Sequence, residues 1–218
     1  MKLYGFWRSL ASYRVRVALA MKGMHADEIS IDLLKGKQNE GDYLAVNPQG
    51  VVPALVLDEG GPPLFQSLAI LEYLEEVRPQ PALLPKDPRG RARVRGLALI
   101  AAADGHPLVT PRIRMYLEKE MKQDENARNR WLGHLTMRAL EAIESHLSKE
   151  KETGRYCHGD APTIADICLA SQMIAALAYF NVDTKAMPTA MRIYNQCMEI
   201  DAFSRAHPLK QQAAGGGH

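Results

Sequence analysis

An α/β domain followed by an all-helical domain is the fold class that the sequence predicts. Three observations support it: strand-like and helix-like segments alternate in the first part of the chain, four prolines then cluster, and the remainder is helical in pattern. A proline cluster with little periodicity is typical of a linker between domains. We therefore expect a first domain over residues 1–81, a linker over 82–90 and an all-helical second domain over 91–218.

The first domain is expected to combine a parallel βαβ unit with an antiparallel hairpin. In order, the pattern predicts a strand over residues 1–6, a helix from Ser12 to Gly23, a strand over 25–33, a mobile loop over 35–41, a helical turn over 43–46, a strand over 51–58, a turn over 59–61, a return strand over 62–65 and a helix opening at Gln66-Ser67.

The second domain is expected to contain helices over residues 89–105, 109–121, 126–149, 167–179 and 188–197, with a kink at His106-Pro107. Thr163 and Asp166 have the spacing of a capping box, so Asp166 is interpreted as a folding element. We expect 188–197 to be the last helix. The low-complexity tail, residues 211–218, is expected to be disordered.

Composition excludes several classes of protein. With 46% hydrophobic and 24% charged residues, the chain is typical of a globular protein, and a net charge of +2 gives no reason to expect nucleic acid or a membrane as the main partner. No signal peptide is recognisable, and the most apolar segment, residues 167–180, is too short to span a bilayer. Three widely spaced cysteines show no metal-ligand spacing, so we expect reduced thiols, a cytoplasmic protein and no metal site.

The strand-turn-helix at the start of the chain is the first candidate site. Ser9 and Ser12 are both natural N-caps, and a helix N-terminus with hydroxyls, free N–H groups and a nearby Arg8 suits a thiolate or another small anion. Ala11 occupies the position most like that of a reactive cysteine, so a sulfur at this site must come with a cofactor. The alternative is an ordinary βα turn with two capping serines.

Two further stretches of the first domain allow more than one interpretation. Proline in a strand removes a hydrogen-bond donor, and X–Pro bonds are mostly trans, so residues alone favour a trans Val52–Pro53 bond. A cis bond would instead free the backbone of Val52 for a ligand. Gln66-Ser67 is either a plain helix start or a place where the helix dipole and the hydroxyl hold an amino-acid carboxylate.

Taken together, these motifs resemble the cytosolic glutathione transferases, and closely the zeta class with its maleylacetoacetate and maleylpyruvate isomerases. The resemblance runs from Leu3 to about Pro208. The segments that carry it are residues 6–9, 12–19, 47–48, 52–55, 66–76, 78–79, 83–85 and 159–166.

The resemblance implies a thioredoxin-like first domain, an all-α second domain, bound glutathione and a homodimer. Its glutathione contacts map onto Gln38, the backbone of Val52 with Pro53 cis, Gln66 and Ser67. It also points to Asp104 and His106, one of which would reach the site of the partner subunit.

Departures from the family pattern concern sulfur and arginine. The Ser-Ser-Cys signature reads Ser9-Leu10-Ala11 here, which leaves Ser9, with Ser12 as second choice, to support the thiolate. The missing cysteine counts against a reductive dehalogenase. Arg8 and Arg112 match two arginines that hold substrate carboxylates, whereas a third is replaced by Tyr179 or Ala178.

The resemblance implies a glutathione-dependent cis–trans isomerase of maleylacetoacetate or maleylpyruvate in aromatic catabolism. A thiolate that adds to the cis double bond leaves a single bond that can rotate, and its departure gives the trans product. One alternative is a broad transferase or peroxidase acting on electrophiles, favoured by the missing cysteine and arginine. Another is a non-catalytic glutathione-binding protein.

Overall fold

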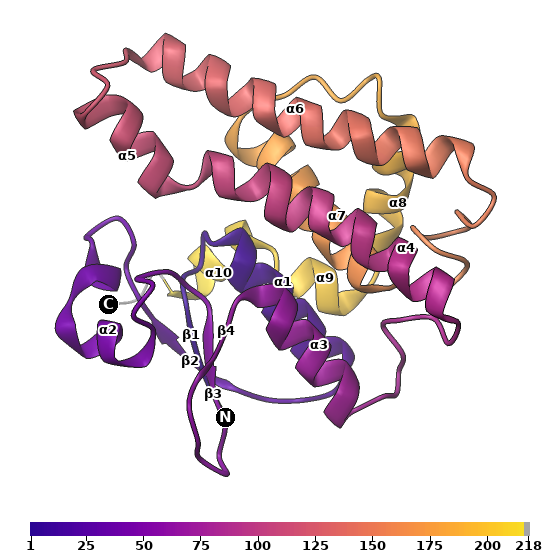
Figure 1. The fold of residues 1–218 in the computed structure, drawn as a ribbon, viewed down its shortest axis with the longest axis horizontal. Helices are drawn as coiled ribbons and strands as arrows, with labels where there is room; N and C mark the ends of the chain where they lie inside the picture. The colour runs from indigo at the N-terminus through magenta and orange to yellow at the C-terminus, as the bar shows by residue number, and fades with distance from the viewer. Residues whose placement is uncertain (216–218) are drawn as a thin grey trace. The chain divides into compact units, whose positions relative to one another are not determined.

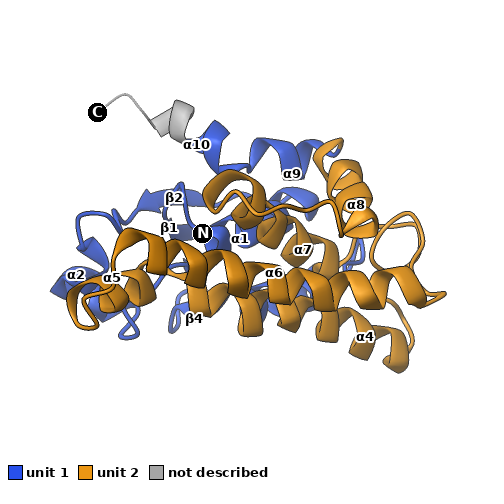
Figure 2. Ribbon diagram, turned by 90° about the horizontal axis from the view of Figure 1, so that it is seen from above, with its two compact units in different colours: residues 1–83, 200–218 blue, residues 84–199 orange. Residues whose placement is uncertain are grey.

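The fold is available as a computed structural model that describes residues 1–215, and only the backbone of 212–215. The chain divides into two compact units (Figures 1 and 2). Unit 1 comprises Met1–Leu83 and the chain from Ile200 onward, whereas unit 2 comprises Leu84–Glu199. The chain therefore enters unit 2 once and returns to unit 1, a return that the expected boundaries do not contain.

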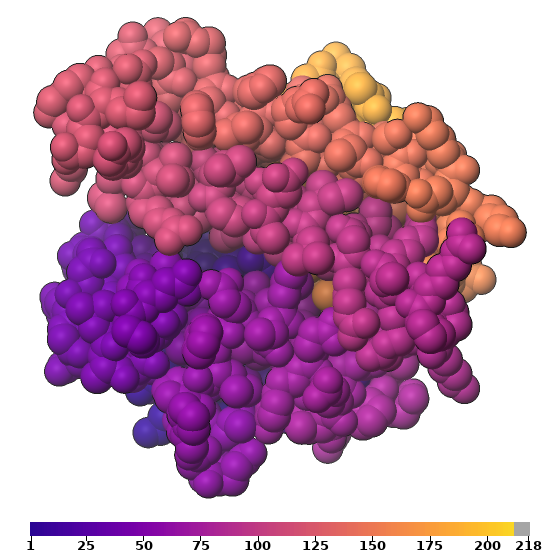
Figure 3. All heavy atoms as spheres, in the orientation of Figure 1, coloured from indigo at the N-terminus to yellow at the C-terminus, as the bar shows by residue number. Residues whose placement is uncertain are grey.

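Unit 1 is built on a four-stranded mixed sheet, as expected. Its strands are β1 (Lys2–Gly5), β2 (Asp27–Ser30), β3 (Ala54–Val56) and β4 (Leu64–Phe65), in the order β2-β1-β3-β4. β1 and β2 are parallel, and the other two pairings are antiparallel. β3 begins only after Pro53, because proline has no N–H to donate to a ladder. The tip of the hairpin that follows β3 projects from the surface (Figures 1 and 3).

Two longer helices of unit 1 pack against each other, α1 (Leu10–Met21) and α3 (Ser67–Val77). The short helices η1 (Lys37–Asn39) and α2 (Gly41–Val46) lie between β2 and β3 in the chain. Ser9 and Ser12 were both candidate N-caps, and the helix expected from Ser12 begins two residues earlier, at Leu10. Ser9 is the N-cap, and its side chain accepts the backbone N–H of Ser12.

A buried ion pair joins the C-terminal ends of α1 and α3. The Lys22 ammonium donates to the Glu75 carboxylate and to the carbonyl of Pro81, while the same carboxylate accepts the N–H of Leu83. Both charged side chains are almost fully buried. Because each has several hydrogen-bond partners, the pair holds the segment that leaves unit 1.

Unit 2 is entirely helical. Its elements are α4 (Pro88–Leu99), the π-helix η2 (Ile100–Gly105), the 3₁₀ helix η3 (His106–Val109), α5 (Pro111–Lys119), α6 (Glu125–Lys149), α7 (Ile164–Ile174), the π-helix η4 (Ala175–Tyr179) and α8 (Pro188–Met198). Three α-helices open with proline, the residue that loses nothing at a first helical position. α4 begins inside the segment expected to be a linker. The expected kink at His106-Pro107 is where η2 passes into η3.

The capping box predicted from Thr163 and Asp166 is present at the start of α7. One carboxylate oxygen of Asp166 accepts the N–H and the hydroxyl of Thr163, both at 2.7 Å, and the other accepts the N–H of Cys157 at 2.7 Å. Asp166 is fully buried. Its place in the fold is therefore structural, as the spacing predicted.

Two helices follow the one expected to be last, α9 (Asp201–Arg205) and α10 (Pro208–Gly215). The expectation of disorder from residue 211 was wrong for 211–215, and residues 216–218 lie outside the described part. α9 packs against α1, and its Phe203 is fully buried. A helix this short carries too few residues for a periodic signal, so its stability comes from that packing.

Candidate active site

The turn between β1 and α1 carries the Ser9 hydroxyl, whose hydrogen is still available to be donated. Ser9 is half-buried, and its Oγ accepts the N–H of Ser12 at 3.2 Å. An N-cap hydroxyl that accepts in this way still has its own hydrogen to donate. No other partner of this hydroxyl occurs among the described residues. The site therefore offers one hydrogen-bond donor at the positive end of a twelve-residue helix.

Ser12, the second choice for this role, is placed differently. It is fully buried, and its Oγ accepts the N–H of Phe6 at 3.3 Å. That bond fixes the backbone of the turn between β1 and α1. Arg8, in the same turn, is half-buried and already takes part in an interaction.

The loop before β3 adjoins this turn. Phe6, Tyr43 and Val52 form a small buried cluster, against which Trp7 packs. The carbonyl of Val51 accepts both the Tyr43 hydroxyl at 2.6 Å and the Asn47 amide at 2.7 Å, which fixes the loop. Burial is the main reason that the pKa of Tyr43 is raised to about 12, so its hydroxyl stays a donor at neutral pH.

The Val52–Pro53 bond is cis. The expectation of a trans bond from residues alone was therefore wrong, and the one drawn from the family resemblance is confirmed. The N–H and C=O of Val52 have no hydrogen-bond partner among the described residues. They stay available to an extended peptide.

Gln38, in η1, is a buried side chain with an unmet hydrogen bond. It is 8% exposed, and its Oε1 has no partner among the described residues. Its backbone carbonyl approaches Gly50, where an added Cβ would lie 3.3 Å away. Gln38 thus lies beside the loop that carries Val52.

The start of α3 is a second helix N-terminus in unit 1. Ser67 is buried, and its Oγ accepts the Nε of Arg14 at 3.0 Å. Gln66 has φ of +66° and donates through its side-chain amide to Gln49 at 2.8 Å. A non-glycine residue at positive φ is strained, and such strain concentrates at functional sites. The helix terminus and the buried guanidinium together favour a carboxylate.

These contacts connect four of the predicted positions within unit 1. The turn that carries Ser9 packs on Val52, whose loop adjoins Gln38 through Gly50 and Gln66 through Gln49. Asp104, His106 and Arg112 belong to unit 2, where they lie on the successive elements η2, η3 and α5. Asp104 and Arg112 are exposed, while His106 is half-buried and has an interaction partner.

Gly105 lies between Asp104, in η2, and His106, in η3, and needs to be glycine. A Cβ at Gly105 would lie 2.7 Å from the Cβ of Ala139 and 3.0 Å from the Gln172 amide. Only glycine therefore lets η2 approach α6 and α7 this closely. The approach fixes the backbone on both sides of it.

Arg14 is the residue that sequence reasoning missed. Nothing in the sequence pattern assigned Arg14 to the site, whereas Arg16 on the same helix binds Glu28 through Nε and Nη2 at 2.8 and 2.7 Å. Arg14 instead places a buried guanidinium behind Ser67, 53 residues away in the chain. The only signal in the sequence was an arginine on a largely apolar helix.

Comparison with known proteins accounts for this combination. A family described as "Glutathione S-transferase, N-terminal domain" matches residues 1–76. A maleylpyruvate isomerase from a Ralstonia species is 44% identical over 97% of this chain and 98% of its own length. A maleylacetoacetate isomerase of Pseudomonas aeruginosa is 42% identical over 97% of both chains.

The chain belongs to the zeta class of the glutathione transferase family. A solved maleylacetoacetate isomerase from Methylobacterium extorquens AM1, described with bound malonate and glutathione, has a TM-score of 0.94 and 47% identity over 97% of this chain and 98% of its own. A holo maleylpyruvate isomerase described as a bacterial zeta-class glutathione transferase has a TM-score of 0.92 and 44% identity over the same shares. The fold expected from the resemblance is thereby confirmed.

Metal ligands and membrane-spanning helices are both absent from the described residues. No three His, Cys, Asp or Glu side chains of this part of the chain are grouped as metal ligands would be. Nor is any helix in it long and apolar enough to cross a bilayer.

Proposed function

We propose that this zeta-class glutathione transferase is a glutathione-dependent cis–trans isomerase of maleylacetoacetate- or maleylpyruvate-type keto acids. The observation that carries the proposal is the Ser9 hydroxyl, which accepts a hydrogen bond from its own helix and keeps its proton for a ligand. The isomerase names of relatives that match nearly the whole chain give the same direction.

The polar groups of unit 1 fit glutathione. The free N–H groups at the start of α3, backed by Arg14 and Ser67, suit the carboxylate of its γ-glutamyl residue. The unpaired N–H and C=O of Val52 suit its peptide backbone, and the unmet Oε1 of Gln38 suits one of its N–H groups. Gln66 lies at the γ-glutamyl end. Ser9 is left for the sulfur.

Bound glutathione would supply the thiolate that adds to the cis double bond and departs after rotation about it. The task of Ser9 is to donate a hydrogen bond to that thiolate, which together with the dipole of α1 lowers the thiol pKa. We assign this role to Ser9 and not to Ser12, because the Ser12 hydroxyl is buried against the N–H of Phe6.

The substrates of such an isomerase carry carboxylates, which call for cations. Arg8 and Arg112 are assigned to this task, since guanidinium groups pair with carboxylates through two parallel hydrogen bonds. Arg112 is exposed and has no partner among the described residues, so it is available to bind. Asp104 and His106 are assigned to glutathione, one of them from the partner subunit.

A homodimer in the cytoplasm is the setting we propose for this activity. Large apolar side chains exposed on unit 2, among them Tyr116, Met121 and Trp131, support a surface covered by another chain. The three cysteines are unpaired, as they are in a reducing compartment. Light scattering at several protein concentrations tests the dimer.

The direct test is an isomerase assay with purified full-length protein. Maleylpyruvate or maleylacetoacetate is incubated with catalytic glutathione, and 1-chloro-2,4-dinitrobenzene is assayed in parallel. We expect turnover of the maleyl acid without net loss of glutathione. Conjugation without isomerisation would favour the broad transferase, which the missing cysteine, at Ala11, and the missing third arginine, at Tyr179 or Ala178, also favour. Retention on a glutathione resin without any turnover would leave a binding protein.

A further inference from the structure

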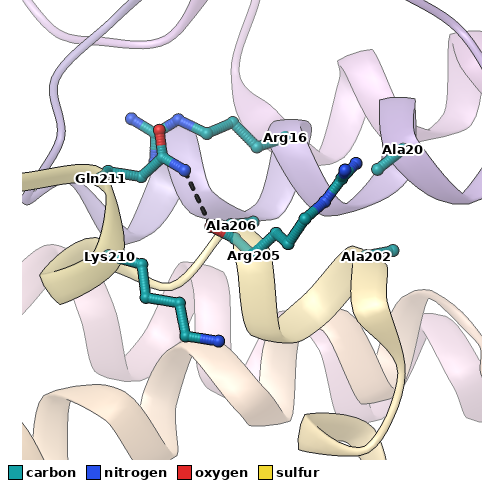
Figure 4. Close-up of a pocket in the computed structure, with 7 residues that line it drawn as sticks. All are labelled: Arg16, Ala20, Ala202, Arg205, Ala206, Lys210 and Gln211. Atoms are coloured by element: carbon teal, nitrogen blue, oxygen red, sulfur yellow. Dashed lines mark hydrogen bonds between the residues drawn. The ribbon is translucent and has the colours of Figure 1, made fainter. Parts of the chain in front are cut away.

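A pocket of about 410 Å³ in unit 1 is lined neither by Ser9 nor by any residue of α3. It is formed by α1, α9 and α10 (Figure 4). Its apolar lining comes from three small residues, Ala20, Ala202 and Ala206. None of the residues that line this pocket has a role in the proposed isomerisation.

The polar lining of this pocket is cationic. Arg16, Arg205 and Lys210 line it together with Gln211, and no carboxylate of the described side chains does. Arg205 is paired with Asp201 at 3.0 Å, but that pair is exposed and weak. The Lys210 ammonium has no partner among the described residues. The pocket therefore favours an anion.

Arg16 adds a buried donor without an acceptor. Its Nε and Nη2 bind Glu28, and Nη2 also donates to the carbonyl of Phe6. Its Nη1 has no acceptor among the described residues, although the side chain is only 8% exposed. A buried N–H without a partner is costly, and native structures rarely leave one. An oxygen in the adjoining pocket would meet that need.

We propose that this pocket binds a short dicarboxylate. One carboxylate would accept from Arg16, beside Gln211, and the other from Arg205, whose guanidinium lies near Ala20, while the Lys210 side chain extends in a third direction (Figure 4). The alanines would contact the carbons between them. Cations at two places with small apolar residues between them suit two separated charges better than one compact tetrahedral anion. The volume is at the lower end of small-molecule sites.

Binding is tested on the full chain with succinate as probe, by isothermal titration calorimetry and hydrogen–deuterium exchange. We expect succinate to slow amide exchange in residues 201–211 and in the middle of α1. Butyrate, which has one carboxylate, should bind about tenfold more weakly, as expected for the loss of one ion pair. Inorganic phosphate that protects the same segments as strongly as succinate would overturn the proposal.

Two variants locate the site by different means. Arg205→Gln with Lys210→Gln removes two charges, whereas Ala20→Leu fills the pocket from an exposed helix position and keeps every charge. Each should weaken succinate binding about tenfold or more. The matched control, Lys86→Gln with Arg89→Gln, removes the same two charges from exposed positions of unit 2 and should leave binding unchanged. Undiminished succinate binding in both pocket variants would refute the assignment.

Discussion

Two helix N-caps of this chain are both hydroxyl residues, Thr163 at α7 and Ser9 at α1, but they differ in the hydrogen bonds that they have left to make. At α7, Thr163 and Asp166 satisfy each other and the N–H of Cys157, and the group is buried. At α1, Ser9 accepts one bond from Ser12, stays half-buried and keeps a donor. The first cap has no hydrogen bond left to offer, while the second has one.

This difference separates folding from function more clearly than residue type does. A capping box consumes its polar groups within the helix terminus, so it stabilises the fold and binds nothing. A cap without an acidic third residue leaves the helix dipole and a hydroxyl to a ligand. The comparison predicts that changes at α7 affect stability alone and that changes at α1 affect activity.

Asp166→Ala should have the largest effect on stability. It leaves the buried N–H groups of Thr163 and Cys157 without an acceptor, at a cost of about 3 kcal/mol in the free energy of unfolding. Urea unfolding of both proteins measures this. Activity per folded molecule should stay within about twofold of the parent. The comparison breaks if activity falls while stability is retained.

Ser9→Ala should lower the turnover number by about 10²-fold, the scale of one lost preorganised donor. Because the start of α3 and Val52 are untouched, the variant should still bind glutathione, as calorimetry would reveal. The unfolding free energy should fall by only about 1 kcal/mol for the lost cap. Ser12→Ala is the matched control, and a silent Ser9→Ala beside an inactive, well-folded Ser12→Ala would reverse the assignment.

Arg112→Ala extends the comparison to an exposed side chain without a partner. Loss of a carboxylate contact should raise KM for maleyl dicarboxylates about tenfold. Chlorodinitrobenzene carries no carboxylate, so its KM should not change. Steady-state kinetics with both substrates decides the point, and an equal rise for both would assign Arg112 to packing.

His207 lies between the two extremes and has the smallest expected effect. It is half-buried, and its Nδ1 accepts the N–H of Leu209 at the start of α10. Burial, and next the charge of Lys210, lower the pKa of His207. Below its ordinary pKa, about 6.5, the unfolded chain binds the proton first, so stability falls as pH decreases from there.

His207→Asn keeps an acceptor at the cap but removes the titration. Between pH 7 and pH 5 it should lose less stability than the parent, by up to about 1 kcal/mol. Thermal unfolding at a series of pH values measures the difference. Parallel curves for the two proteins would contradict the role of His207.

Local signals in the sequence were enough for most of the fold. The order of strands and helices, the capping box and the candidate Ser9 turn depend on neighbours along the chain, so they could be predicted. Arg14 could not, because its partner Ser67 lies on another helix. The cis bond at Pro53 and the short α9 also depend on packing, α9 on the burial of Phe203. The family resemblance predicted the cis bond, whereas nothing in the sequence predicted α9.

Phe203 belongs to the unit in which the chain begins, so unit 2 is an insertion within unit 1. A gene cut once after Leu83 would yield a first fragment lacking the helix that packs on α1. A stop codon after Glu199 would leave unit 2 complete but would remove α9 and α10 from unit 1. Unit 1 can therefore be produced on its own only by joining residues 1–83 to the segment that begins at Ile200, with a short linker in place of Leu84–Glu199.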